Sequence, residues 1–208
     1  LADYIAWFNA NAECNAENLA AVVPALEPVW THTPASPLVG RAALLGAQAL
    51  EKSGNAAGAL ELLRKHYLAL AQPQGDLAMA NAFLANNDAV SAAVYAQRVY
   101  YGYPTAPEAA DAEALIKTLR EQLGEKYPPA MGNALLGRAN KLLDAGQPDK
   151  ARKELATVIP QLGGAERDAA LVKLGVAGFN TRDTQAAQRY LDGLSVESPA
   201  ADAERLYY

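Results

Sequence analysis

Residues 132–151 read GNALLGRANKLLDAGQPDKA, the pattern of two short helices joined by a tight turn. Ala139 and Ala151 lie twelve residues apart, one in each expected helix. Small side chains at such positions let the backbones of two antiparallel helices approach closely, because the helix separation depends on the side chains at the contact. This stretch therefore predicts a helical hairpin with an alanine from each helix at the crossing point.

The same pair of small residues occurs four times along the chain. The pairs are Ala47 and Ala59, Ala80 and Ala92, Ala139 and Ala151, and Gly175 and Ala187. Aligning them defines repeats at residues 40–71, 73–104, 132–163 and 168–199. One helix–turn–helix unit recurring in a fixed register is typical of a helical-repeat protein. We therefore expect an all-α fold, a right-handed superhelix (α-solenoid) of antiparallel helix pairs.

The turns inside these repeats agree with the register. They are Ser53-Gly54-Asn55, Asn86-Asn87-Asp88, Ala145-Gly146-Gln147-Pro148 and Asn180-Thr181-Arg182-Asp183. Glycine and asparagine are expected to supply the left-handed residue that ends the first helix. Asn55, Asp88 and Asp183 are then placed to cap the second helix, and Pro148 suits its first turn.

The repeats do not account for the whole chain. An amphipathic stretch at 106–123 predicts one extra helix between the second and third repeats. Residues 1–37 predict a degenerate first pair in which Pro24 kinks or splits the second helix. Residues 201–208 look like the start of a further helix. Because the pattern runs throughout, we expect residues 1–208 to form a single repeat domain.

Composition excludes several classes of function. The net charge of −5 lacks the basic patch of a nucleic-acid binder. Cys14 is the only cysteine, and His32 and His66 have no carboxylate at metal-ligand spacing, so we expect no metal site and no cofactor. The sequence contains no run of 18 apolar residues, so we expect no membrane-spanning helix.

The start at Leu1 and the helical pattern at the end suggest a piece of a longer or processed protein.

Polar residues in the first helix of each repeat are candidates for binding. The slot after the small residue holds Gln48, Asn81 and Asn140, with Val176 in the fourth repeat, and a neighbouring slot holds Arg41, Gln74 and Asn133. Amide side chains in successive repeats can bond an extended peptide or a sugar chain along a groove. The alternative is three unrelated exposed polar residues.

Four tyrosines near the end of the second repeat are further candidates, because tyrosine stacks on sugars and is common at interfaces. We expect Tyr95 and Tyr100 to pack against neighbouring helices. Tyr101 and Tyr103 are open to either packing or ligand binding.

Glu61 and Glu154 have lysine or arginine side chains three or four residues away on the same helix. This spacing favours surface ion pairs over acid–base catalysis.

The repeat slots resemble the tetratricopeptide repeat, with a small residue at the eighth position, alanine at the twentieth and proline at the thirty-second. Three segments are also similar to the helical N-terminal region of soluble lytic transglycosylases: Ser36-Pro37-Leu38, residues 93–104 and residues 203–208. In that family an α-superhelix precedes a lysozyme-like domain that cleaves the MurNAc–GlcNAc bond of peptidoglycan. The resemblance implies a non-catalytic scaffold that positions such a domain and cradles glycan or protein partners in the periplasm.

The catalytic motif of that family, Glu-Ser-x-Phe, is not matched in this chain. Its only Glu-Ser pair, Glu197-Ser198, is followed by Pro199 and Ala200. We therefore expect no catalytic residue within residues 1–208. The alternative is a free-standing tetratricopeptide adaptor that binds a peptide or protein, for which a cytoplasmic location is equally suitable. An enzyme complete within these residues is the third possibility.

Overall fold

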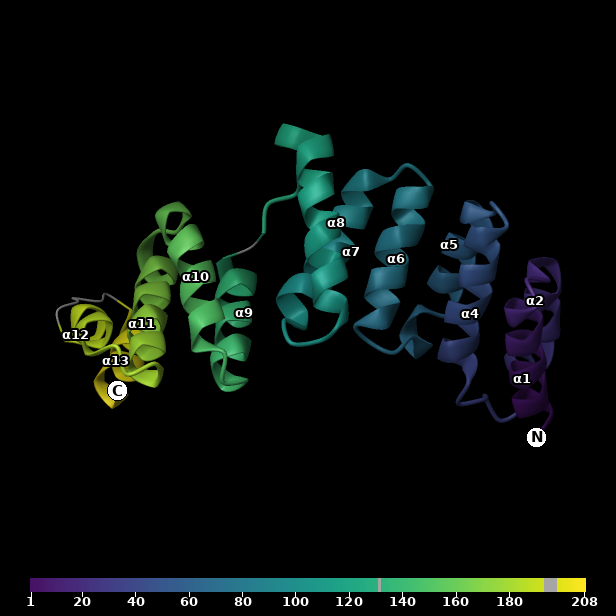
Figure 1. The fold of residues 1–208 in the computed structure, drawn as a ribbon, viewed down its shortest axis with the longest axis horizontal. Coiled ribbons are helices and arrows are strands. Elements are labelled where there is room, and N and C mark those ends of the chain that lie inside the picture. Colours follow the sequence, from purple (N-terminus) through teal and green to yellow (C-terminus); the bar gives the residue numbers. More distant parts are fainter. Residues whose placement is uncertain (131, 193–197) are drawn as a thin grey trace. The chain divides into compact units, whose positions relative to one another are not determined.

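A computed structural model describes residues 1–130, 132–192 and 198–208 (Figure 1). The chain forms two compact units. Unit 1 comprises Leu1–Val99 and Ala110–Pro128, and unit 2 comprises Tyr100–Ala109 and Pro129–Tyr208. Within the described residues every regular element is an α-helix or a short 3-10 helix, and none is a strand. The expected all-α class is therefore confirmed.

Unit 1 is built from helices that stand side by side in chain order (Figure 1). Two helices extend past its bounds: α7 ends three residues after Val99, and α8 begins two residues before Ala110. Its elements are α1 (Ala2–Asn15), α2 (Leu19–Ala25), α3 (Glu27–Trp30), α4 (Val39–Lys52), α5 (Ala56–Lys65), η1 (Tyr67–Ala69), α6 (Gln74–Ala85), α7 (Ala89–Gly102), α8 (Glu108–Leu123) and η2 (Gly124–Lys126).

Unit 2 contains the helices of the third and fourth repeats, α9 to α12, followed by α13. Its elements are α9 (Gly132–Asp144), α10 (Pro148–Val158), η3 (Ile159–Gln161), α11 (Gly164–Asn180), α12 (Thr184–Leu191) and α13 (Pro199–Tyr207). Ser198 caps α13 by accepting from the Ala201 amide, so Pro199 starts a helix here, where the repeat pattern had it end one. Glu197, the first residue of the Glu-Ser pair, lies outside the described residues.

The small-residue slots lie where the helix pairs pack. In unit 1, Ala47, Ala59, Ala80 and Ala92 are all buried, as are Ala139, Ala151 and Gly175 in unit 2, while Ala187 is half-buried. Around them, larger apolar side chains fill each core, including Leu63, Met79 and Phe83 in unit 1 and Leu155 and Leu174 in unit 2. Burial of this apolar surface is the main force that holds each pair together.

At Gly40 and Gly178, the backbone of another segment lies where a side chain would begin. A Cβ added at Gly178 in α11 would lie 2.8 Å from the Ala186 Cβ and 2.9 Å from the Ala187 amide nitrogen of α12. A Cβ added at Gly40 in α4 would clash with the carbonyl group of Ala69, with its carbon at 2.7 Å. An alanine at either position would collide with these atoms, so the close backbone approach at both places depends on glycine.

The turn chemistry follows the sequence in most details. The side chains of Asn55, Asp88 and Asp183 accept from the amides three residues later, at 2.9, 3.0 and 3.1 Å, which confirms them as helix caps. Gly54, Asn87 and Gly146 adopt the left-handed conformation, as expected. In the fourth turn Arg182, with φ of 59°, takes this role instead of Asn180. Pro24 lies inside α2, and the chain breaks from α2 to α3 at Leu26.

Candidate binding surface

The predicted polar residues of unit 1 lie on two helices that pack against each other, α4 and α6. Arg41 and Gln48 are exposed on α4, and Gln74 and Asn81 are exposed on α6. Each amide in the second slot follows a buried alanine, Ala47 or Ala80. Successive residues of a helix point about 100° apart. Packing of the alanine against the partner helix therefore turns the next side chain toward solvent.

Apolar side chains separate these polar groups. Leu44 lies between Arg41 and Gln48 on α4, Leu77 lies between Gln74 and Asn81 on α6, and both leucines are half-buried. Spacings of three and four residues place all members of each set on one side of their helix. The surface therefore offers amide donors and acceptors beside partly accessible leucine side chains. We call these six residues, Arg41, Leu44, Gln48, Gln74, Leu77 and Asn81, the inner row of unit 1.

One carboxylate lies close to the inner row. Glu51 follows Gln48 by one helical turn on α4 and is half-buried. Burial raises the pKa of the Glu51 carboxyl, because removing water disfavours the charged form. With Arg41 about three turns away on the same helix, this side of α4 carries one group of each sign, and it has no cluster of lysine and arginine.

The matching residues of unit 2 are less accessible. Asn133 is exposed on α9, but Asn140 is half-buried, and its Oδ1 atom is buried without a donor among the described residues. Val176 on α11 is buried and packs with Val172, Leu191 and Ala201. Because Ala201 belongs to α13, that helix covers the slot in the fourth repeat. The structure therefore brings Arg41, Gln48, Gln74 and Asn81 together on neighbouring helices and places Asn133 and Asn140 on α9 alone.

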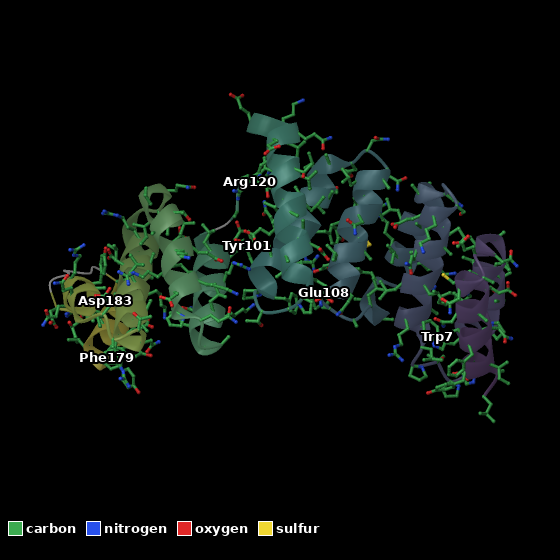
Figure 2. The ribbon with its side chains drawn as sticks, viewed as in Figure 1. Trp7, Tyr101, Glu108, Arg120, Phe179 and Asp183 are labelled. Carbon is green, nitrogen blue, oxygen red and sulfur yellow. The ribbon has the colours of Figure 1, made fainter. Side chains whose placement is uncertain are left out.

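The candidate tyrosines also differ in how accessible their rings are to a ligand. Tyr95 stacks on Phe83 with a centroid distance of 5.2 Å, so it packs inside unit 1 as expected. Tyr101, labelled in Figure 2, is only 8% exposed and offers little ring surface to a ligand. Its ring meets that of Tyr100 edge to face at 5.0 Å. Tyr103 is 37% exposed, with the Lys141 amine 6.0 Å from its ring centroid.

An ion pair in unit 2 that joins buried Arg138 to partly exposed Glu154 is not predicted by the sequence. The Arg138 Nε and a terminal nitrogen donate to the two carboxylate oxygens of Glu154 at 2.7 and 2.9 Å. The guanidinium also donates to the Tyr100 carbonyl and stacks on the Tyr100 ring at 3.6 Å. Arg138 is 6% exposed and occupies the slot just before the small residue Ala139. In the other repeats this slot holds glycine or an apolar residue. A charged residue at this position was therefore the one sequence signal of a buried polar contact.

A second polar cluster joins three elements of unit 1. The Tyr67 hydroxyl on η1 donates to the buried Asp76 carboxylate on α6 at 2.6 Å, and the Arg98 Nε on α7 lies 3.1 Å from its other oxygen. Burial and the hydrogen bond to Asp76 raise the pKa of Tyr67 to about 12. The carboxylate is compensated by a hydroxyl and a cation, so the cluster serves structure and leaves no free base for catalysis.

Asp3, His32 and Ser36 form a third cluster with the residue types of a hydrolytic triad. The Ser36 hydroxyl donates directly to Asp3 at 2.7 Å and lowers the pKa of that carboxyl. The His32 Nε2 is 3.6 Å from the other Asp3 oxygen, and its Nδ1 lies 2.7 Å from the Pro34 carbonyl. A triad needs histidine between serine and aspartate to take the serine proton. Here aspartate is in the middle, so the cluster fastens the connector before α4 to α1.

Neither a metal site nor a membrane span emerges from the part of the chain that the structure describes. It contains no group of three His, Cys, Asp or Glu side chains that could hold a metal ion. Its helices are too short or too polar to cross a bilayer. Comparison with known protein families, curated proteins and solved structures found no match to the chain.

Proposed function

We propose that the chain is a non-catalytic helical-repeat scaffold, arranged as a right-handed superhelix, that binds an extended partner along the inner row of unit 1. The observation that carries this proposal is the exposure of Arg41, Gln48, Gln74 and Asn81 on adjacent helices. We further propose, from the sequence resemblance, that it belongs to a periplasmic peptidoglycan lytic transglycosylase. Its role there is to position the catalytic domain and to hold glycan strands or partner proteins.

The chemistry of the inner row suits an extended polar chain. An amide side chain donates two hydrogen bonds and accepts through its oxygen, which matches the hydroxyl and acetamido groups of a glycan as well as a peptide backbone. Neutral amides bind such groups without requiring a charge on the ligand. No described cluster has the arrangement of a nucleophile and its base, which is consistent with a binding role.

A second candidate, the free-standing adaptor that binds a peptide or protein, is favoured by one observation. Leu44 and Leu77 are partly accessible between the polar groups of the inner row. Peptides bring apolar side chains at regular intervals, and burial of such groups contributes about 25 cal/mol per Å². A glycan strand has no equivalent side chains, so the leucines discriminate between the two ligand classes.

Binding measurements on a double variant test the proposal. Gln48→Ala with Asn81→Ala removes two side-chain amides, each of which contributes about 1 kcal/mol when hydrogen-bonded. We expect affinity for the cognate ligand, measured by calorimetry with purified glycan strands and with a peptide library, to fall about 10- to 30-fold. Gln122→Ala is the matched control, because Gln122 is an exposed amide on α8 outside the inner row.

Each outcome has a definite meaning. Unchanged affinity in the double variant contradicts the inner row as the binding surface. Loss of peptide binding, but not of glycan binding, in Leu44→Ala with Leu77→Ala supports the adaptor. Release of soluble fragments from peptidoglycan by this chain alone contradicts a non-catalytic role. A Glu-Ser-x-Phe segment encoded beyond Tyr208 supports the transglycosylase proposal.

A further inference from the structure

The first helix of unit 1 has an apolar face that no described residue covers. Tyr4, Ile5 and Phe8 are 46%, 60% and 68% exposed, and Leu1 is 92% exposed. Their spacings of three and four residues place them on one side of α1, with exposed Ala12 continuing the same side. We call these five residues the outer face of α1.

The opposite side of α1 is firmly held. Ala6 and Ala10 are buried, and half-buried Trp7 and Cys14 pack on the same core against α2, α3 and α4. Trp7 marks this helix in Figure 2. Because the inward side is fixed, α1 cannot turn to bury its outer face against its own unit. The exposure of three large apolar side chains is therefore a property of the folded surface.

The rim of this face carries one charged group, the α-ammonium of Leu1, which lies 3.3 Å from the Asp3 carboxylate. The exposed polar side chains of α1 are the asparagines Asn9 and Asn15, whereas Asp3 is buried and Glu13 is half-buried and bonded to Asn18. An aromatic centre with a polar rim is the composition of a protein interface. The wider segment 1–40 has four acidic residues and no lysine or arginine. A contact confined to the outer face avoids repulsion between those acidic groups.

We infer that the outer face of α1 binds the same face of a second copy of this chain. Two copies of α1 in antiparallel orientation place Tyr4, Ile5 and Phe8 of each against their counterparts, the self-complementary arrangement of a two-fold dimer. With about 150–250 Å² for a large side chain, the four exposed groups offer on the order of 500 Å² per copy. The total, on the order of 1,000 Å², is in the range of weak, reversible interfaces.

Sedimentation equilibrium of the full chain tests this inference. We expect the average mass to rise with concentration from 22.0 kDa toward twice that value, with a Kd on the order of 100 µM. Phe8→Glu, which brings two carboxylates into the contact, raises the Kd at least about 10-fold. Because the contacting side chains are apolar, added salt should change this Kd little.

Val94→Glu is the matched control, because Val94 is an exposed apolar residue on α7, 42% exposed, and gains the same charge. Both variants keep the helicity of the parent chain by circular dichroism, and the control keeps its Kd within about two-fold. A parent chain that remains monomeric up to about ten times the expected Kd overturns the inference. Equal weakening by Val94→Glu also overturns it, since the dimer would then use another surface.

Discussion

The two units bury charge of opposite sign, and each compensates it in a different way. Unit 1 buries the carboxylates of Asp3 and Asp76, and each accepts a neutral hydroxyl, from Ser36 or Tyr67. Unit 2 buries the guanidinium of Arg138, which faces the carboxylate, a carbonyl and an aromatic ring. A buried carboxylate can lose its charge but a buried guanidinium cannot. The two units should therefore unfold under different conditions.

A carboxylate can neutralise itself by taking up a proton, whereas arginine stays charged at every accessible pH. Loss of a partner therefore costs less in unit 1, where the Arg98 side chain is also half-exposed and can be hydrated. In unit 2 the loss of Glu154 leaves a buried guanidinium with no such means of relief, and the loss of Arg138 removes three hydrogen bonds and a ring contact at once. The stability of the Arg138 pair is thus the stronger test of this difference.

Removal of the Arg138 side chain should have the largest effect. Arg138→Ala leaves Glu154 without its bidentate partner and empties a buried site, which costs about 3–5 kcal/mol. Urea denaturation should show a lower midpoint, and hydrogen exchange should accelerate most in α9 and α10. Arg152→Ala is the control: its ion pair with Asp183 is half-exposed, so it should cost no more than about 1 kcal/mol. Equal losses in both variants would remove the distinction between them.

Substitution of the buried carboxylate in unit 1 should cost less. Asp76→Asn keeps an oxygen for the Tyr67 hydroxyl but removes the charge that faces Arg98. We expect a loss of about 1–3 kcal/mol in urea denaturation, with exchange accelerated in α6. Asp111→Asn on the exposed side of α8 is the matched control and should change stability by less than about 0.5 kcal/mol. A loss at Asp76 that matched the Arg138 variant would contradict the comparison.

The smallest effect concerns the pH dependence of unit 1. The pKa of Tyr67 is raised to about 12 from the usual 10.0, so the folded state holds this proton more tightly than the unfolded chain. The corresponding stabilisation is complete below pH 10 and is lost as pH rises toward 12. Tyrosinate absorbance should show one tyrosine that ionises late, and Tyr67→Phe should abolish that late step. Ionisation of all tyrosines near pH 10 in the parent chain would refute the prediction.

Local features of the fold could be predicted because they depend on neighbouring residues. The four hairpins, three helix caps and the left-handed residues of three repeat turns follow from alanine, glycine, asparagine and aspartate at fixed spacing. The exceptions show where local signals end. Arg182 is left-handed, a conformation that few residues other than glycine and asparagine adopt, so its residue type does not predict it. The division into two units depends on long-range packing, which a repeat pattern does not encode.

The candidate surface was predictable only in part for the same reason. Gln48 and Asn81 are exposed because the alanine before each is buried in the expected slot. Val176 follows the same rule of spacing but is buried, since α13 covers it. The partners of Asp3, Asp76 and Arg138 are 33, 9 and 16 residues away, and no local pattern links them. Such pairs can be predicted only when it is known which helices pack against each other.

The glycine contacts also limit how each unit can move. At Gly178 the backbone of α11 meets α12, and at Gly40 α4 meets the segment after α5, without a side chain as spacer. Two helices in such contact cannot slide past each other without collision of their main chains. Each hairpin should therefore behave as a rigid body, with elastic bending confined to the joints between hairpins. A ligand on the inner row spans the joint between α4 and α6, so its binding would stiffen one of the joints at which the unit can flex.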